Sequence, residues 1–560
     1  MTVPSRGGDP PIPPAPPAGG RTEAGGAAGQ AADLLLLGGT VVDGTGGPRR
    51  VADVAVRGDR IVAVGDVAGL TAPQVVDVSG LIVAPGFVDA HGHSDIAVLS
   101  APGVPSKIHQ GVTTEVMGNC GLGVAPVGPG ADPGAVRSLL SIVDVDPGVA
   151  WRWRTMAEYL DTVEAQGTAM NVAALAGHLA IRASCVGFGD RAATPAELDG
   201  MCDLADQALA DGAAGLSTGL MYPPNAYARA DELLALGAVV ARHGALFTFH
   251  MRDYGDRLLE SVAEALAVAE ASGCRVQLSH LAVVGRRNWG TVARALEAVT
   301  AAAQRGADVG VDIYPYLAGS TNLTQLLPRW ALEGGTGPML ERLANAGDRR
   351  RISDEIERHR LQEWTDILLA SGEFADGAYP AGQSVAELAA AHGRPPAELL
   401  LDLVTASGGT AVIVAFGRSE DDLRAALTHP LSMIGSDGLG LDPAGPSGAG
   451  QPHPRSYGCY PRLLGSYVRD EQVLTLEAAV HKSTLQVARR FAIPDRGLVA
   501  AGAVADLVAF DPARIADRAT YANPHQMAAG IAAVIVAGRP VLRDGRATGE
   551  LPGAVLRRTA

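Results

Sequence analysis

Eight short apolar segments repeat along the middle of this chain of 560 residues, and helical or turn patterns separate them. After residues 246–250, for example, apolar side chains recur at helical spacing as far as Gly273, a residue type that often ends helices. Alternation of strands with helices is typical of a parallel sheet, and eight such units predict a TIM (β/α)8 barrel. The predicted strands are 81–88, 113–117, 172–176, 215–217, 246–250, 276–280, 309–313 and 431–435.

Residues of metal-binding types lie at the ends of several of these segments. The first runs into Asp89-Ala90-His91-Gly92-His93, and histidines two apart on an extended chain point the same way, so both could reach one ion. Cys120, His250, His280 and Asp437 end or follow later segments. The carboxyl ends of barrel strands form the active site, so these side chains predict a zinc centre. Taken alone, His91 and His93 could be loop residues without a partner.

Both ends of the chain alternate short apolar runs with turns, which predicts a small β-sandwich domain built from residues 32–80 and 490–555. The barrel would occupy residues 81–489, with a helical, lid-like insertion at 334–429 that is too long for a simple loop. Residues 1–31 are rich in Pro, Gly and Ala, and we expect a disordered tail there.

The charge and cysteine content exclude several classes of function. The net charge is -15 and the chain contains only two lysines, Lys107 and Lys482, so nucleic acid is not an expected partner. No apolar run is long enough to span a membrane. Five cysteines without paired spacing favour reduced thiols and a cytoplasmic location.

The scarcity of lysine also bears on the metal centre. In many two-metal barrels a carboxylated lysine from a middle strand bridges the ions, and neither lysine here lies on such a strand. Cys120 ends the second predicted strand, with Gly118 and Gly121 nearby. Its thiolate could hold one zinc ion or bridge two, although a buried cysteine can also be simply a small apolar side chain.

Further motifs lie at 86–93, 110–121, 215–224, 312–316, 434–438, 453–455 and 505–512. Together they resemble the D-aminoacylase (N-acyl-D-amino-acid deacylase) branch of the amidohydrolase superfamily, from about residue 33 to 545. By this resemblance, Cys120, His250 and His280 hold a tight zinc ion, and His91, His93 and Asp437 serve a second, weaker site. Asp437 would move the proton, and Tyr314 and Arg455 would hold the substrate's oxyanion or carboxylate.

One position departs from the family pattern. Members generally carry a lysine two residues after the second zinc histidine, where it helps to bind the substrate's carboxylate, whereas this chain has Ala282. Arg286 or Arg287 could compensate from the following loop, but solvated surface charges are the simpler interpretation of both. The substrate's carboxylate is then held by Arg455 alone, or the preferred substrate is not an ordinary N-acyl-D-amino acid.

The leading hypothesis is a zinc-dependent hydrolase that cleaves a linear amide in a small molecule, converting an N-acyl-D-amino acid and water to a carboxylate and a D-amino acid. A cyclic-amide hydrolase of the hydantoinase or dihydroorotase kind is the main alternative, but it requires a bridging lysine. A specialised deacylase or D-peptidase would use the same site. A catalytically inactive barrel would have lost ligands that this chain retains.

Overall fold

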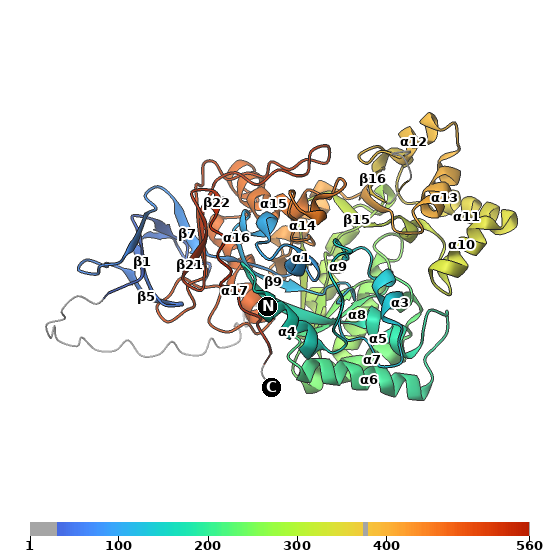
Figure 1. The fold of residues 1–560 in the computed structure, drawn as a ribbon, viewed down its shortest axis with the longest axis horizontal. Helices are drawn as coiled ribbons and strands as arrows, with labels where there is room; N and C mark the ends of the chain where they lie inside the picture. Colours follow the sequence, from blue (N-terminus) through green and yellow to red (C-terminus); the bar gives the residue numbers. More distant parts are fainter. Residues whose placement is uncertain (1–30, 373, 375–378, 559–560) are drawn as a thin grey trace, which may run out of the picture.

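A computed structural model of the protein describes residues 31–372, 374 and 379–558. Eight parallel strands form one sheet in the order β18-β14-β13-β12-β11-β10-β9-β8, with helices packed around it (Figure 1). Their residues are almost all buried, as expected where helices cover the outside and side chains fill the inside. The predicted TIM barrel is confirmed. The strands are β8 (Phe87–Asp89), β9 (Val112–Met117), β10 (Asn171–Gly177), β11 (Gly215–Gly219), β12 (Leu246–His250), β13 (Arg275–Leu278), β14 (Val309–Ile313) and β18 (Ser432–Ile434).

The segment predicted as one strand at 81–88 forms two strands in two different sheets. β7 (Ile82–Pro85) pairs with β19 (Leu507–Phe510) of the small β domain, whereas β8 begins the barrel. Gly86 lies at the break, and a β-carbon there would overlap the side chain of Thr113. Both strands are buried, so hydrophobicity alone does not reveal the change of sheet.

The barrel closes just beyond the end of β8. The amide of Asp437 donates to the His91 carbonyl at 2.7 Å, and the amide of His93 donates to the Gly438 carbonyl at 3.1 Å. Two segments almost 350 residues apart in sequence therefore lie side by side at the carboxyl end of the barrel. This seam brings the histidine pair next to Asp437.

A buried cation holds the seam together. The Lys107 ammonium lies 2.8 Å from Asp89 Oδ2 and 3.0 Å from Glu115 Oε2. It also donates to Ser436 Oγ at 2.9 Å and to the carbonyl of Gly438 at 3.1 Å. Burial lowers the pKa of Lys107, but the two carboxylates outweigh burial and raise it. One charged group thus joins β8, β9 and the loop that follows β18.

Helices cover the outside of the barrel. α4 and α6 begin with capping boxes, Thr155 with Glu158 and Thr194 with Glu197, and α8 ends at Gly273 in the left-handed conformation. No helix among the described residues is long and apolar enough to cross a membrane. The helices packed around the barrel are α4 (Met156–Gln166), α5 (His178–Cys185), α6 (Pro195–Ala210), α7 (Ala230–Arg242), α8 (Leu258–Ser272), α9 (Thr291–Gln304), α14 (Glu420–Thr428), α16 (Leu476–Lys482) and α17 (Leu485–Arg490).

The insertion differs from the predicted helical subdomain at 334–429. It contains a three-stranded antiparallel sheet, β15-β17-β16, in addition to its helices (Figure 1). α14, which the prediction included, packs against α9 and β14 of the barrel instead. Three isolated short strands among helices give little periodicity, which is why the sequence did not indicate the sheet. Its elements are β15 (Ala318–Asn322), α10 (Thr336–Ala344), α11 (Ala346–His359), β16 (Ile367–Ser371), α12 (Val385–Ala391), α13 (Pro396–Ala406) and β17 (Val412–Phe416).

Strands from both chain ends lie together at the left of Figure 1, in two sheets ordered β5-β4-β1-β6 and β22-β21-β20-β19-β7-β2-β3. The predicted tail at 1–31 lies outside the described residues except for Ala31, which bridges to Thr71. Val555 pairs with Val172 of β10, so the chain end packs on the barrel. The remaining strands are β1 (Leu34–Leu37), β2 (Thr40–Val41), β3 (Arg50–Val51), β4 (Asp53–Arg57), β5 (Arg60–Gly65), β6 (Gln74–Asp77), β20 (Ile531–Val536), β21 (Arg539–Arg543) and β22 (Arg546–Ala547).

Replacement of Lys107 by Met is expected to lower the free energy of unfolding by about 3–5 kcal/mol, because Asp89 and Glu115 would stay buried without their cation. Lys482 is a matched control, since it is also buried but donates to backbone carbonyls such as that of Ser432. Lys482→Met should cost about 1–3 kcal/mol. Chemical denaturation measures both values, and a larger loss for Lys482→Met would contradict the role given to Lys107.

Candidate metal centre and substrate pocket

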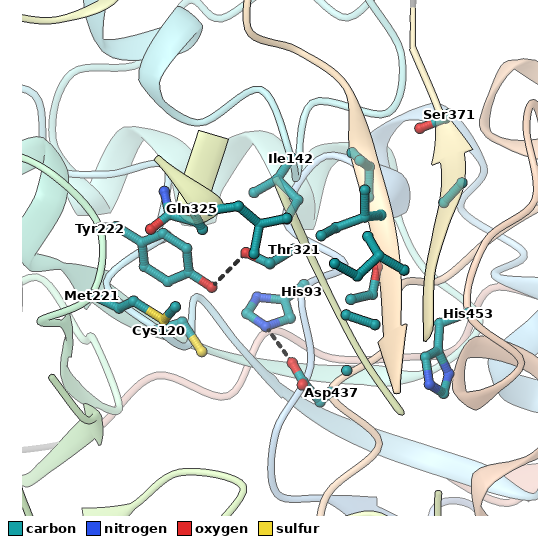
Figure 2. A pocket seen from close by; sticks show the side chains of 18 of the residues that line it. His93, Cys120, Ile142, Met221, Tyr222, Thr321, Gln325, Ser371, Asp437 and His453 are labelled. Atoms are coloured by element: carbon teal, nitrogen blue, oxygen red, sulfur yellow. Dashed lines mark hydrogen bonds and ion pairs between the residues drawn. The ribbon is translucent and has the colours of Figure 1, made fainter. Parts of the chain in front are cut away.

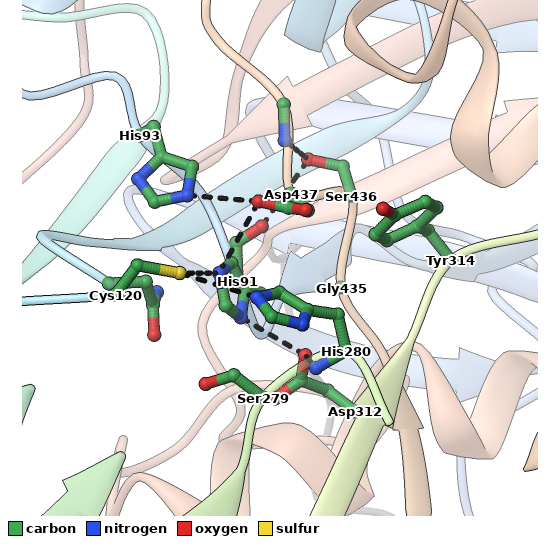
Figure 3. Close-up of polar contacts among 12 residues, drawn as sticks. His91, His93, Cys120, Ser279, His280, Asp312, Tyr314, Gly435, Ser436 and Asp437 are labelled. Atoms are coloured by element: carbon green, nitrogen blue, oxygen red, sulfur yellow. Dashed lines mark hydrogen bonds and ion pairs between the residues drawn. The ribbon is translucent and has the colours of Figure 1, made fainter. Parts of the chain in front are cut away.

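Two groups of potential metal ligands lie at the carboxyl ends of the barrel strands. Figure 3 labels all members of the first group, together with Cys120 and His280 of the second. Within each group the ligand atoms lie within 4.8 Å of one another, and every member is buried. Cys120 belongs to both groups, with its Sγ 3.2 Å from His91 Nε2 and 3.4 Å from His280 Nε2. The structure therefore places the thiol between two potential metal positions. The groups are His91, His93, Cys120 and Asp437, and Cys120, His250 and His280.

The His250 imidazole supports a metal ion in the second group. Both ring nitrogens are buried, and neither has a hydrogen-bond partner among the described residues. Burial lowers the pKa of His250 to about 3, so the ring is neutral and offers a lone pair. A buried polar atom without a partner is costly, and coordination would satisfy it. Neutral imidazoles with a thiol form a donor set that fits zinc.

The Cys120 thiol requires a nearby cation to ionise. Burial raises its pKa to about 11, although a charged His91 would act in the opposite direction. A coordinated metal ion deprotonates a thiol outright. The environment of Cys120 is therefore suited to a metal ligand and unfavourable for a free thiolate.

Asp312, to which the sequence motifs assign no role, orients His91. Its Oδ1 lies 3.0 Å from His91 Nδ1 and accepts a hydrogen bond from the His280 amide at 2.8 Å. Its Oδ2 accepts from Gln277 Nε2 at 3.1 Å. A carboxylate on the second nitrogen of a ligating histidine fixes the tautomer and the ring orientation. The available signal in the sequence is an acidic residue inside an otherwise apolar strand.

Three of the potential ligands have left-handed backbone conformations. The φ angle is 58° at Cys120, 37° at His280 and 50° at Asp437. Each residue follows a barrel strand by two or three positions, where the chain turns sharply. Such conformations cost of order 1–3 kcal/mol in residues other than glycine and cluster at functional sites.

The Asp437 carboxylate lies between His93 and Arg455. Its Oδ1 is 2.9 Å from His93 Nε2, and its Oδ2 is 2.6 Å from Arg455 Nη1. Burial raises the pKa of Asp437, but Arg455 and the nearby imidazoles outweigh burial and hold it well below its usual range. Arg455 also donates to the Tyr314 hydroxyl at 2.8 Å. The two residues predicted to bind substrate therefore adjoin Asp437, and Arg455 is already engaged by it.

A pocket of about 860 Å³ contains members of both ligand groups, and this size suits a small molecule. The insertion contributes Thr321, Gln325 and Ser371 to its wall (Figure 2). The Tyr222 and Thr321 hydroxyls lie 3.2 Å apart and connect a barrel loop to the insertion. Much of the remaining lining is apolar, including Leu122, Ile142, Val143, Leu326, Leu361, Val412 and Ile413.

The arginines considered as substitutes for the family lysine lie elsewhere. Ala282 is buried, whereas the side chains of Arg286 and Arg287 are 73% and 52% exposed. Arg287 pairs with Asp256 at 2.6 Å. Neither arginine lines the pocket formed by the described residues, so the structure agrees with the simpler interpretation of both as surface charges.

Comparisons with known proteins agree with this architecture. The model of the Amidohydrolase family matches residues 74–542. The chain is 39% identical to D-aminoacylase of Alcaligenes xylosoxydans xylosoxydans, covering 95% of this chain and 99% of the relative. It is also 39% identical to N-acyl-D-glutamate deacylase of that organism, covering 94% and 97%.

Solved structures extend the similarity to three dimensions. N-acyl-D-glutamate deacylase from Bordetella bronchiseptica, complexed with zinc and a phosphonate inhibitor, is 35% identical with a TM-score of 0.81. A D-aminoacylase with a binuclear metal centre, described by one-metal activation and second-metal attenuation, is 37% identical with a TM-score of 0.79. Both alignments cover 94% of this chain and 100% of the relative. The chain belongs to the D-aminoacylase (N-acyl-D-amino-acid deacylase) family of amidohydrolases.

Proposed function

We propose that this protein is a zinc-dependent deacylase that hydrolyses an N-acyl-D-amino acid to a carboxylate and a D-amino acid. The observation that carries the proposal is the position of Asp437, which belongs to a potential ligand group and faces the same pocket as Cys120, His250 and His280. Relatives with this activity in their names match nearly the whole chain. The apolar pocket wall favours an apolar acyl group or D-side chain.

The two ligand groups have different roles in this proposal. Cys120, His250 and His280 hold the tight zinc ion, because the His250 nitrogens have no other partner among the described residues. His91 and His93 contact Asp312 and Asp437 respectively, so their nitrogens are partly satisfied without metal. The second position is therefore the weaker one.

The chain's own residues manage the proton and the substrate. A bound zinc ion lowers the pKa of water to about 7 and polarises a carbonyl. Asp437 accepts the proton of the attacking water and delivers it to the leaving nitrogen. Arg455, 2.6 Å away, keeps that carboxylate ionised and oriented. The Tyr314 hydroxyl and the remaining N–H groups of Arg455 contact substrate oxygens in the pocket.

The structure disfavours a cyclic-amide hydrolase with a carboxylated lysine. Carboxylation requires a neutral amine, whereas Asp89 and Glu115 raise the pKa of Lys107 and keep it charged despite burial. Lys482 donates to carbonyls at the start of β18, away from the strand carboxyl ends. Hydantoinase structures share only 16% identity with TM-scores of 0.51 and 0.53, which reflects the common fold.

We also propose a cellular compartment and a size class for the substrate. All five cysteines are free, which supports a reducing, cytoplasmic compartment. The substrate is a small molecule, which suits a pocket of about 860 Å³. A specialised deacylase or D-peptidase would keep the same metal centre and differ only in the pocket wall.

The two ligand groups can be separated by their zinc content. Cys120→Ala is expected to lose zinc from both positions because the thiol belongs to both groups, whereas His93→Ala should retain the tight ion. Elemental analysis after dialysis, with and without a chelator, measures the bound zinc. Equal losses in both variants would contradict the assignment of the tight site.

The proposed activity predicts strict dependence on configuration and metal. With zinc, the purified protein should release acetate from N-acetyl-D-methionine and not from its L-isomer. Exhaustive chelation should abolish the release, and added zinc should restore it, because water activation requires the ion. Hydrolysis of a hydantoin in preference to the linear amide would reverse the choice between the two enzyme classes.

Asp437→Asn should lower kcat by roughly 10²- to 10⁴-fold, since the amide cannot carry the proton. The tight zinc ion should remain bound, because Asp437 is not in the group with His250. Asp253 is a matched control, as it lines the same pocket outside both ligand groups. Asp253→Asn should keep nearly full activity, and similar losses in the two variants would remove the special role of Asp437.

A further inference from the structure

Four arginines line the pocket among the described residues, and they differ in their partners. Three of them form an ion pair with a carboxylate, so their charge is largely neutralised within the protein. Arg418 forms no ion pair with any described residue. The three pairs are Arg252 with Glu264 at 2.9 Å, Arg360 with Glu363 at 2.8 Å, and Arg455 with Asp437 at 2.6 Å.

The Arg418 guanidinium has unused hydrogen-bond donors. Its Nε and Nη1 are buried, and neither has a partner among the described residues. Donors of a buried cation cost several kcal/mol in general when they remain unsatisfied. Neither of the chain's two lysines lines the pocket, so Arg418 is the cation there that remains available to an anion from outside.

Arg418 lies beside the residues that surround the reaction centre. Its guanidinium carbon is 4.6 Å from the centroid of the Tyr314 ring, and that of Arg455 is 4.8 Å from the same centroid. The Tyr314 hydroxyl in turn contacts Arg455, which holds Asp437. An anion bound by Arg418 would therefore lie close to the scissile bond without displacing Asp437 from Arg455.

The backbone next to Arg418 is fixed by the loop that follows β13. The Gly417 carbonyl accepts hydrogen bonds from the Gly285 amide at 3.0 Å and from Trp289 Nε1 at 2.9 Å. This loop carries His280 and Ala282. The barrel segment that supplies a potential zinc ligand therefore holds the backbone beside Arg418.

We propose that Arg418 binds the carboxylate of the N-acyl-D-amino acid substrate, as a specificity-determining residue contributed by the insertion. The planar guanidinium fork suits two parallel hydrogen bonds to a carboxylate. The proposal rests on the deacylase function proposed above and identifies the group that selects acids over neutral amides. It also accounts for recognition of an anion by a pocket that contains no lysine.

The test compares N-acetyl-D-methionine with N-acetyl-D-methioninamide, whose carboxylate is replaced by a neutral amide. Arg418→Gln should lower kcat/KM for the acid by roughly 10- to 100-fold, the loss typical of a hydrogen bond to a charged group. The amide, measured as a substrate or as a competitive inhibitor, should change by less than about 3-fold. Arg418→Lys should recover part of the loss, since it restores charge without the fork.

Arg360→Gln is the matched control, because Arg360 lines the same pocket but is paired with Glu363. It should leave the preference for the acid unchanged, which separates direct contact from a general change of charge. The ratio of the kcat/KM values for the acid and the amide, measured on one preparation, does not depend on the fraction of folded protein.

Three results would overturn the proposal. Equal losses for acid and amide would make Arg418 a structural residue, and an Arg418→Gln variant that loses no kcat/KM for either compound would place the carboxylate elsewhere. Either result would leave the deacylase function intact as long as the wild-type protein hydrolyses the acid. A wild-type protein that hydrolyses no N-acyl-D-amino acid would overturn the proposed function and this inference together.

Discussion

The chemistry of this protein depends on how its barrel closes around the Lys107 ammonium. Burial of a lysine with two carboxylates brings a large desolvation cost. Such a cluster therefore contributes more to the alignment of the segments that it joins than to the net stability of the fold. Here it ties Asp89 at the end of β8 to Glu115 in β9 and to Ser436 just before Asp437. Because the Asp437 amide then bonds to the His91 carbonyl, the seam itself fixes the position of Asp437 relative to the potential ligands.

The two groups of potential ligands share one thiol, so ions bound in both groups would not be independent. Cys120 approaches His91 on one side and His280 on the other, at 3.2 and 3.4 Å. Electron density that a thiolate donates to one ion is less available to a second ion beside it. A sulfur shared in this way provides a physical basis for coupling between two ions. Occupancy of the weaker position would also engage Asp437 and compete with its role in proton transfer.

The residues that the structure groups as potential metal ligands were already candidates in the sequence, because their signal is local. His250 and Asp437 each end or follow an apolar run, and the repetition of that pattern implies a common edge of one barrel. Asp312 was not predicted, since its contact with His91 depends on the closure of the barrel between distant strands. Lys107 was identified only as unsuitable for bridging metals, and nothing local indicates that it is buried with two carboxylates. The break at Gly86 was missed because both flanking strands are equally apolar.

In the proposed arrangement, residues of the barrel carry out the reaction and a residue of the insertion recognises the substrate's carboxylate. A substrate carboxylate placed on Arg455 would share one guanidinium with Asp437, and two like charges about 4 Å apart repel by about 4 kcal/mol near a protein surface. That repulsion would raise the pKa of Asp437 and oppose the ionised state that accepts the proton. With the substrate's carboxylate on Arg418, each anion has its own cation, and Tyr314 lies against both guanidinium groups. Changes in the insertion can then alter which substrate is bound without disturbing the ionisation of the catalytic carboxylate.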